Sequence, residues 1–284
     1  MDIIFYNPLS KNGKTLDTVN ELIRKLNVKR EKISIYSLLE IENIDDFLKT
    51  IDPTDRLIFV GGDGTLHRLA NAIYDKNIKN KLFVYKAGTG NDFLRSLKKK
   101  KEYLVDATEY LKKLPEVTIN GNKHYFLNGV GIGIDGLICY MVNTSKEEKN
   151  AINYFKNTVR AFFKTKKIKK VKVNIDGNDI EFKNVWFCSV LNDKYMGGGM
   201  KFAPKANRNN SDLYLVTIKS VPKWLLPLLL PSIYLGWHVI FKGFVKVIRI
   251  KKNIKIEFDR DSYLQMDGEV EYPVTKIDVK PFQK

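Results

Sequence analysis

The stretch RLIFVGGDGTLHRLANAI occupies residues 56–73. It opens with a mostly apolar run that predicts a buried strand, and it ends in a segment that predicts a helix. The glycines between them let the backbone approach a phosphate group, while Thr65 and the amides at the helix start supply hydrogen-bond donors. Gly61, Gly62, Asp63, Gly64 and Thr65 are therefore predicted to form a phosphate-binding turn. An ordinary glycine turn with a helix cap is the simpler alternative.

Asp63 needs a separate explanation, because a carboxylate does not attract a phosphate group. It must bind a metal ion, bind a sugar hydroxyl, or orient the loop. The spacing alone leaves these three roles open.

A second glycine-rich turn, AGTGNDFLRSL, follows the apolar strand KLFVY at residues 87–97. Gly88, Thr89 and Gly90 repeat the pattern of the first turn, and Asn91 and Asp92 place an amide and a carboxylate at the start of a helix. Two such turns can face one nucleotide. Asp92 has a simpler alternative role as the N-cap of its helix.

The segments around these turns set the fold class. IIFYN, a helix over residues 15–26, ISIYSL and the two glycine-ended strands alternate as strand and helix. This rhythm predicts an α/β domain with a mainly parallel sheet that binds its ligand at the carboxyl ends of its strands. After about residue 115, strand-like runs and turn residues predict an antiparallel β-sandwich or barrel. We place the domains at residues 1–115 and 116–284.

The composition restricts the class of binding partner but does not identify it. The 284 residues carry 49 Lys and Arg against 32 Asp and Glu, a net charge of +17. This excess predicts an anionic partner, namely phosphate, nucleic acid or an acidic membrane. Cys139 and Cys188 lie in apolar runs and are predicted to be buried thiols, which fits a reducing compartment. The start of the chain does not resemble a secretory signal, so we expect a cytoplasmic protein.

Two segments raise the question of a membrane. Residues 221–245 are rich in Leu, Trp, Ile and Phe but are interrupted by Pro222, Pro227 and Pro231. We expect this segment to pack on the protein with an apolar face available to lipid; a plain core helix and a spanning helix are the alternatives. Residues 146–170 alternate aromatic and basic residues, as in a helix that binds an anionic bilayer or in a solvated helix that packs through its aromatic residues.

Six ordered motifs resemble the diacylglycerol kinase catalytic family, particularly its small soluble bacterial lipid kinases. They are N-P-x-S-x-x-G at residues 7–13, GGDGT at 61–65, GTGNDF at 88–93, FLNGVGIGID at 126–135, MGGGMKFAPKA at 196–206 and MDGE at 266–269. The resemblance covers nearly the whole chain. Sphingosine, ceramide and NAD kinases are more distant relatives.

The resemblance implies a nucleotide-binding α/β domain, a β-sandwich domain, and a cleft between them where ATP meets a lipid. Asn7 and the loops 61–65 and 88–92 would then hold ATP. Asp267 would take the proton from the lipid hydroxyl, with Glu269 beside it. By itself, DGE would instead indicate a hairpin turn with solvated acids. The triphosphate implies Mg²⁺, for which Asp63 and Asp92 are the candidate carboxylates.

The predicted activity is ATP-dependent transfer of the γ-phosphoryl group to a membrane lipid, with diacylglycerol as the favoured acceptor and phosphatidic acid as its product. We expect peripheral association with the inner, anionic face of the membrane, no nucleic-acid partner, and a homodimer as a plausible assembly. The tail around residues 275–284 is expected to return to the first domain. Asp135, in the glycine-rich GIGID run, either faces the cleft or caps a turn.

Three departures from the family pattern bear on activity. His67 and Arg68 replace the Asn-Glu pair that commonly follows GGDGT, and Thr118 stands near the position of a family carboxylate. The metal-binding turn reads Asn210-Ser211-Asp212, which weakens the case for a structural Mg²⁺. An NAD kinase-like enzyme and a catalytically weak lipid-binding regulator are therefore retained as alternatives.

Overall fold

The computed structural model of the chain describes residues 1–8, 13–26, 32–76, 78–87, 91–97, 102–145 and 151–282. It divides into two compact units, Met1–Lys113 and Leu114–Lys284. The division falls close to the boundary that we placed from sequence.

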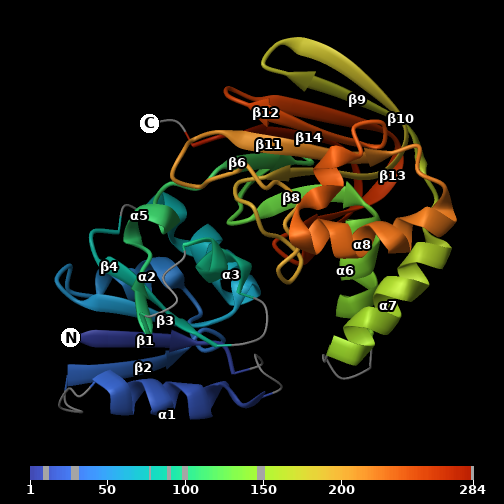
Figure 1. Cartoon of the computed structure of the whole chain (residues 1–284). Helices are drawn as coiled ribbons and strands as arrows, with labels where there is room; N and C mark the ends of the chain where they lie inside the picture. Colours follow the sequence, from blue (N-terminus) through green and yellow to red (C-terminus); the bar gives the residue numbers. More distant parts are fainter. Residues whose placement is uncertain are drawn as a thin grey trace. The chain divides into compact units, whose positions relative to one another are not determined.

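The first unit is built on a five-stranded sheet in the order β2-β1-β3-β4-β5 (Figure 1). Strands β1 to β4 are parallel, and β5 runs antiparallel to β4. Its elements are β1 (Asp2–Tyr6), α1 (Thr15–Leu26), β2 (Ile33–Ser37), α2 (Ile44–Lys49), β3 (Arg56–Gly61), α3 (Asp63–Ile73), η3 (Tyr74–Lys76), β4 (Lys81–Lys86), α4 (Asp92–Ser96), β5 (Leu104–Asp106) and α5 (Thr108–Leu111). The mainly parallel α/β fold predicted from the sequence is confirmed.

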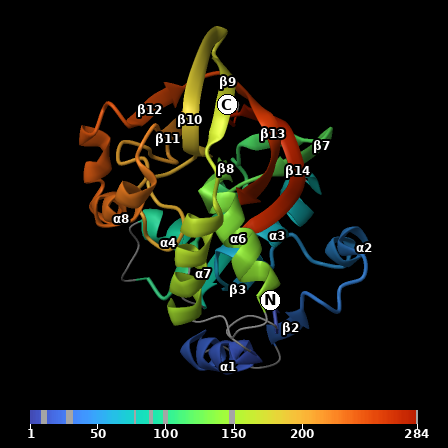
Figure 2. The same cartoon turned by 90° about the vertical axis from the view of Figure 1, so that its right-hand side faces the viewer.

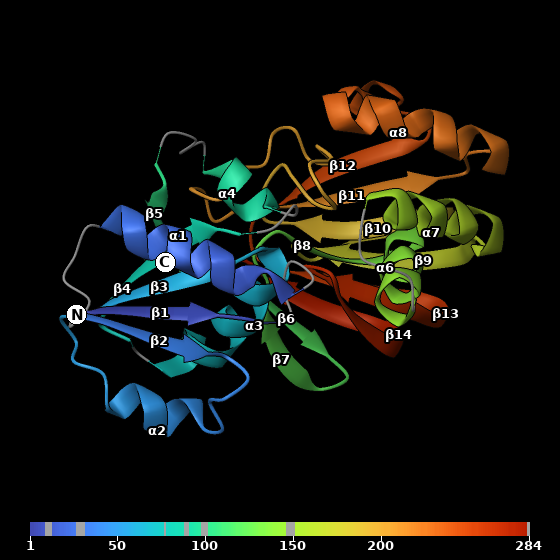
Figure 3. The same ribbon diagram turned by 90° about the horizontal axis from the view of Figure 1, so that it is seen from below.

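Alternation along the strands places helices on both faces of this sheet. Ile4 belongs to a buried cluster with Val19 and Leu22 of α1, which lies across β1 and β3 in Figure 3. The next residue, Phe5, points to the opposite face, where its ring meets that of Phe47 on α2 at 5.7 Å. Because successive strand residues face opposite sides, one apolar run supports both layers.

The register of the parallel strands brings their carboxyl ends together. Tyr6 pairs with Val60, and Gly61 pairs with Lys86. The segments that follow β1, β3 and β4 therefore start at the same edge of the sheet, which is the edge where parallel sheets bind ligands.

The second unit contains a nine-stranded antiparallel sheet in the order β12-β11-β10-β8-β13-β14-β6-β7, with β9 pairing with β10 and β13. Its elements are β6 (Glu116–Ile119), β7 (Asn122–Tyr125), β8 (Gly129–Gly133), α6 (Ile134–Thr144), α7 (Ala151–Lys164), β9 (Ile168–Ile175), β10 (Asn178–Leu191), β11 (Leu213–Lys219), η4 (Lys223–Leu225), α8 (Leu226–Leu235), η5 (Trp237–Ile240), β12 (Val245–Ile250), β13 (Ile254–Met266) and β14 (Glu269–Lys280). Figure 2 shows α6 beside α7 in this unit.

The long strands β10 and β13 fold the second sheet around its main core. One half of each strand pairs with β8 and the other half with β9. Buried residues from nearly all strands, among them Val130, Val171 and Leu264, form one apolar cluster. The predicted antiparallel β-sandwich domain is confirmed.

Of the tail around residues 275–284, the part through Lys280 lies in β14, which pairs with β6 and β13, and the alternating apolar residues Ile277 and Val279 belong to the core of the second unit. The motif FLNGVGIGID begins in a loop, because Phe126, Leu127 and Asn128 connect β7 to β8.

Residues 221–245 form two short 3-10 helices around α8. Among the described residues, no helix is both long enough and apolar enough to cross a membrane. The segment is not a plain core helix either, because several of its large apolar side chains are exposed.

Candidate functional site

The first glycine turn connects β3 to α3 as predicted. Gly61 is the last residue of β3, Gly62 is the N-cap of α3, and Asp63, Gly64 and Thr65 form the first turn of the helix. The helix has no side-chain cap at its N-terminus. The backbone N–H groups at the N-terminus of a helix and the helix dipole favour an anion at such a position.

Gly61 and Gly64 are glycines for different reasons. A Cβ atom on Gly61 would lie 2.5 Å from Cβ of Thr65, so the turn itself excludes a larger residue there. A Cβ atom on Gly64 would meet nothing within 4 Å. A helical glycine costs about 1 kcal/mol relative to alanine. The packing of the described residues therefore does not account for Gly64, whereas close approach of a ligand to the helix would.

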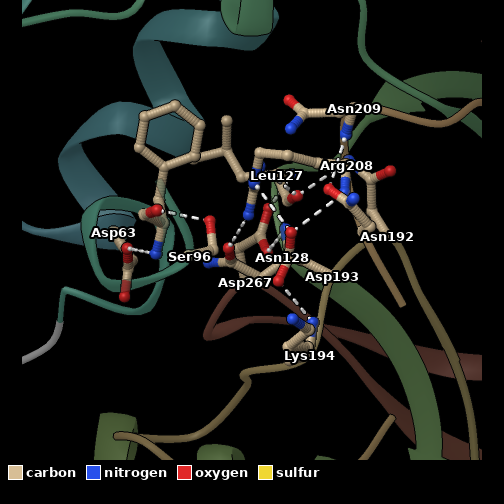
Figure 4. Close-up of polar contacts among 12 residues, drawn as sticks. Asp63, Ser96, Leu127, Asn128, Asn192, Asp193, Lys194, Arg208, Asn209 and Asp267 are labelled. Carbon is tan, nitrogen blue, oxygen red and sulfur yellow. Dashed lines mark hydrogen bonds and ion pairs between the residues drawn. The ribbon is translucent and has the colours of Figure 1, made fainter. Parts of the chain in front are cut away.

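Asp63 ties the first glycine turn to the second. Its carboxylate accepts hydrogen bonds from the backbone N–H groups of Asp92 (2.7 Å) and Phe93 (3.0 Å). Figure 4 shows one hydrogen bond of the Asp63 side chain. The turns are also joined where the N–H of Ala87 donates to the carbonyl of Gly61 at 3.3 Å. Of the three roles left open for Asp63, the structure supplies the orientation of the loop.

The second turn differs from the simplest expectation for Asp92. Asn91 occupies the N-cap position of α4, and Asp92 is the first helical residue and is buried. The capping role considered for Asp92 is wrong, because Asp63 caps this helix from outside. Gly88, Thr89 and Gly90 lie outside the described residues, and their predicted role stays a prediction. Asn7 directly follows β1 and is half-buried.

The carboxylates suit Mg²⁺ only in part. Both oxygens of Asp63 accept backbone N–H groups, and the described residues hold no group of three or more Asp, Glu, His or Cys side chains that could enclose a metal. Mg²⁺ usually keeps several waters and binds one or two carboxylates together with substrate phosphates. Asp63 and Asp92 fit that second mode, in which the nucleotide brings most of the ligands.

In the second unit, Asp267 lies in the tight turn between β13 and β14. It has φ 50° and is followed by Gly268 at φ 97°, the left-handed pair that an Asp-Gly hairpin turn requires. Its carboxylate accepts hydrogen bonds from the N–H groups of Leu127 (2.6 Å), Asn128 (2.8 Å) and Gly129 (3.2 Å). The hairpin alternative is thus right about the turn but wrong about solvation, because Asp267 is buried.

The loop that Asp267 binds is also held from its other side. Asn192 donates to the carbonyl of Leu127 at 3.0 Å, and Arg208 donates to the same carbonyl at 3.2 Å and to Oδ1 of Asn128 at 2.9 Å. Asp193 accepts the backbone N–H of Arg208 at 3.0 Å and pairs with its side chain. Figure 4 shows these residues grouped around Leu127 and Asn128.

Sequence analysis did not select this second group. Asn128 lies within a quoted motif, but nothing in the sequence connects it to residues 64 and 80 positions later, Asn192 and Arg208. A hydrogen-bonding network between such distant segments leaves no local pattern. Only the pairing of β8 with β10 and β13 brings them together.

Asp135, at the start of α6, is linked to the Asp267 turn by Gln265. The amide of Gln265 lies 3.4 Å from Oδ2 of Asp135, and its oxygen accepts the N–H of Gly268 at 3.3 Å. Ser189 donates to the same carboxylate at 2.8 Å, whereas Oδ1 is buried and has no hydrogen-bond partner among the described residues. Burial raises the pKa of Asp135 to about 6. Glu269 is the first residue of β14 and is half-buried.

The departures from the family pattern lie in distinct environments. Arg68 is exposed on α3 while His67 is buried. Thr118 lies in β6 opposite Asp278. The Asp212 carboxylate forms an ion pair with Arg249, which supplies a positive charge where the family turn would bind a metal. Cys188 is buried as predicted, whereas Cys139 is only half-buried, and desolvation raises the pKa of both thiols to about 12.

Comparison with known families covers both units. The model of the diacylglycerol kinase catalytic domain matches residues 3–120, and the model of the YegS C-terminal NAD kinase beta sandwich-like domain matches residues 128–282. The chain belongs to the diacylglycerol kinase family whose catalytic domain is followed by this β-sandwich domain.

Individual relatives agree with the family. The YtlR protein of Bacillus subtilis, provisionally named a lipid kinase, is 30% identical over 61% of this chain and 62% of its own length. A diacylglycerol kinase of Staphylococcus aureus is 26% identical over 94% of this chain and 85% of its own length. A Bacillus anthracis crystal structure, provisionally assigned as a diacylglycerol kinase, matches with a TM-score of 0.70 at 22% identity, covering 99% of this chain and 94% of that one. This structural match supports the fold.

Proposed function

We propose that the protein is an ATP-dependent lipid kinase that phosphorylates diacylglycerol to phosphatidic acid. One observation carries the nucleotide part of the proposal: Asp63 joins two glycine-rich turns at the carboxyl edge of a parallel sheet, next to the uncapped N-terminus of α3. Family membership supports a kinase, and the names of relatives favour a lipid acceptor.

The chemical step requires a hydroxyl oxygen of the lipid to attack the γ-phosphorus of ATP. The new O–P bond forms as the bond to the β,γ-bridging oxygen breaks, and ADP leaves with that electron pair. In the proposal, Asp267 accepts the hydroxyl proton and later releases it to water. Mg²⁺, bound with the triphosphate, would offset the charge on the phosphate oxygens. The three N–H donors to Asp267 would keep its carboxylate in one orientation for this transfer.

The first experiment is ATP-dependent phosphorylation of a lipid panel in mixed micelles with Mg²⁺. The panel contains diacylglycerol, monoacylglycerol, a sphingoid base, a ceramide and a polyprenol, and a parallel reaction contains NAD. We expect phosphatidic acid as the main product, and a loss of about 10²-fold or more with Asp267→Asn. NAD phosphorylation would favour the NAD kinase-like alternative, and absence of turnover would favour a regulator.

Asp267→Asn also weakens the anchoring of loop 127–129, so a structural loss must be separated from a catalytic one. Melting temperature and affinity for a fluorescent ATP analogue provide the two readouts. If catalysis alone is lost, nucleotide affinity stays near that of the wild type. Glu271→Gln serves as the control variant, because Glu271 is an exposed acid of the same hairpin, four residues after Asp267 in β14.

An enzyme whose acceptor is a membrane lipid must act at the surface of a bilayer. We therefore propose that the protein associates peripherally with an anionic membrane. A homodimer remains a proposal to be checked by light scattering. Nucleic acid is not proposed as a partner, because charge alone suggested it and the glycine turns have no use in that role.

A further inference from the structure

Helix α8 is apolar on nearly all sides, yet the protein covers only one of them. Leu226, Leu229 and Ile233 are buried in an apolar cluster of the second unit. Leu228, Pro231 and Leu235, which share a face at helical spacing, are exposed. A helix that is apolar all round is normally buried on all sides or in contact with lipid. The outer face of α8 therefore calls for an apolar partner.

Exposed apolar side chains continue on both sides of α8. Trp224 precedes the helix, and Trp237 and Ile240 follow it in η5. The end of α7 adjoins the same region, because Lys223 donates to the carbonyls of Phe163 (2.7 Å) and Thr165 (3.2 Å). We call the following set the docking surface, with exposed fractions in parentheses: Phe163 (78%), Trp224 (73%), Leu228 (64%), Leu235 (53%), Trp237 (63%) and Ile240 (67%).

The inner side of this segment is firmly attached. His238 is fully buried, with Nε2 2.9 Å from the carbonyl of Phe202. The N–H of Lys201 donates to the carbonyl of Ile233 at 3.0 Å. A Cβ atom on Gly236 would lie 2.8 Å from the Lys201 side chain. The exposed residues are therefore held on a packed support and do not belong to a loop that simply lacks a core.

Basic residues flank the docking surface along the chain. The sequence has no acidic residue between Glu148 and Asp176, nor between Asp212 and Glu257. Exposed basic residues from α7 and from the ends of the apolar segment are Arg160, Lys164, Lys166, Lys223, Lys242 and Lys246. Apolar and aromatic residues beside basic ones match an anionic bilayer, whose interface accepts Trp rings and whose headgroups attract Lys and Arg.

We propose that the docking surface inserts into the headgroup region of an anionic phospholipid bilayer, with α8 lying along the interface. This inference rests on the proposed lipid kinase function and gives that enzyme its contact with the membrane. A second copy of the chain is a poorer occupant, because a two-fold contact would bring the same basic residues face to face. Nucleic acid would leave Leu228, Leu235 and Ile240 without a role.

The tryptophans provide a direct measurement. The sequence has three, and two of them, Trp224 and Trp237, belong to the docking surface. The third, Trp186, is buried and donates its indole N–H to the carbonyl of Val221 at 2.8 Å. We expect a blue shift of fluorescence and sedimentation with vesicles of phosphatidylcholine containing about one quarter phosphatidylglycerol, and little response to phosphatidylcholine alone. Binding should weaken at high ionic strength, about 1 M NaCl, because salt screens the attraction between the basic residues and the headgroups.

Matched variants test whether vesicles bind at the docking surface and not elsewhere on the protein. Leu228→Gln combined with Trp237→Ser should reduce vesicle affinity at least about tenfold, because both lose apolar area that would enter the interface. Leu39→Gln is the control, since Leu39 is also exposed (56%) but lies in the first unit. Lys242→Glu should weaken binding to anionic vesicles more than Lys79→Glu does.

Several outcomes would overturn the proposal. These are the absence of vesicle binding, equal binding to neutral and anionic vesicles, a blue shift on self-association without lipid, and a blue shift with an oligonucleotide. Equal loss in the Leu39→Gln control would also overturn it, because the effect would then be independent of location.

The vesicles contain no acceptor lipid, so binding is measured independently of catalysis. Phosphorylation of a water-soluble short-chain diacylglycerol should be unchanged in the docking-surface variants. If no acceptor is phosphorylated but vesicles still bind, the proposed activity fails and the docking surface stands. If the short-chain acceptor is phosphorylated but vesicles do not bind, the docking surface fails alone.

Discussion

Asp63 in the first unit and Asp267 in the second are both acids in glycine-rich turns, and both carboxylates accept backbone N–H groups from a loop elsewhere in their unit. Asp63 lies in the first turn of a helix and caps another helix through two N–H groups. Asp267 has a left-handed backbone in a hairpin and holds a loop through three. One acid orients a glycine-rich turn, and the other fastens a hairpin to a loop distant in sequence.

An Asp residue within a sequence motif therefore need not be exposed to solvent or bind a metal directly. Backbone N–H groups satisfy the charge and fix the carboxylate at the same time. Asp135 provides the contrast, because one of its oxygens is buried without a hydrogen-bond partner in the part of the chain that the structure describes, and its pKa is raised to about 6 by burial. We predict the effects of four substitutions in and around these turns, ordered from the largest expected effect on stability to the smallest.

Asp267→Ala should cost about 3 kcal/mol or more of folding stability, because it strands three N–H groups in a buried loop. Chemical denaturation measures the loss. Glu269→Ala, at a half-buried position next to the turn, should cost clearly less. Equal losses for the two variants would mean that the three hydrogen bonds do not anchor the turn.

Asp135→Asn should stabilise the protein at neutral pH. The folded-state pKa of Asp135, about 6, lies above its ordinary value of 3.8, so the folded state binds more protons between these values. The wild type therefore loses stability as pH rises from about 4 to about 6, by at most about 3 kcal/mol. Melting temperatures at pH 5 and pH 8 should show a larger advantage of the variant at pH 8. If the stability advantage of Asp135→Asn were the same at both pH values, the wild-type Asp135 carboxyl would not be a buried charge at pH 8.

Asp63→Ala should cost about 1 to 2 kcal/mol, which is the range for losing a helix cap. It should also lower ATP affinity, because the second glycine turn loses its support. Thermal unfolding and binding of a fluorescent ATP analogue measure the two effects. Asp17→Ala, in the first turn of α1, is the control for an acid at a helix start. Unchanged ATP affinity would show that Asp63 has no part in nucleotide binding.

Gly64→Ala should stabilise the protein by up to about 1 kcal/mol, since alanine favours a helix and the position is open. At the same time it should reduce ATP affinity, because a methyl group would intrude where a phosphate approaches. Gly61→Ala should instead destabilise, through the clash with Thr65. A Gly64→Ala protein with wild-type ATP affinity would remove the phosphate interpretation of this glycine.

Much of the fold followed from local patterns. The alternating apolar runs predicted the parallel sheet of the first unit, and the helix expected over residues 15–26 matches α1 (Thr15–Leu26). The turn after Val60 was recognisable because strand, glycines and helix are consecutive. The place of the tail depends on tertiary context, because its residues through Lys280 form β14 in the sheet of the second unit.

The sequence by itself determined the two-domain plan, the two glycine turns and the strong positive charge, because each depends on neighbouring residues or on composition. Only the tertiary structure decided the partners of Asp267, since the N–H groups that it binds lie 138 to 140 residues away. It also decided which apolar residues of the segment 221–245 are buried and which are exposed. Hydrogen bonds and burial depend on distance in space, and local sequence patterns do not carry that information.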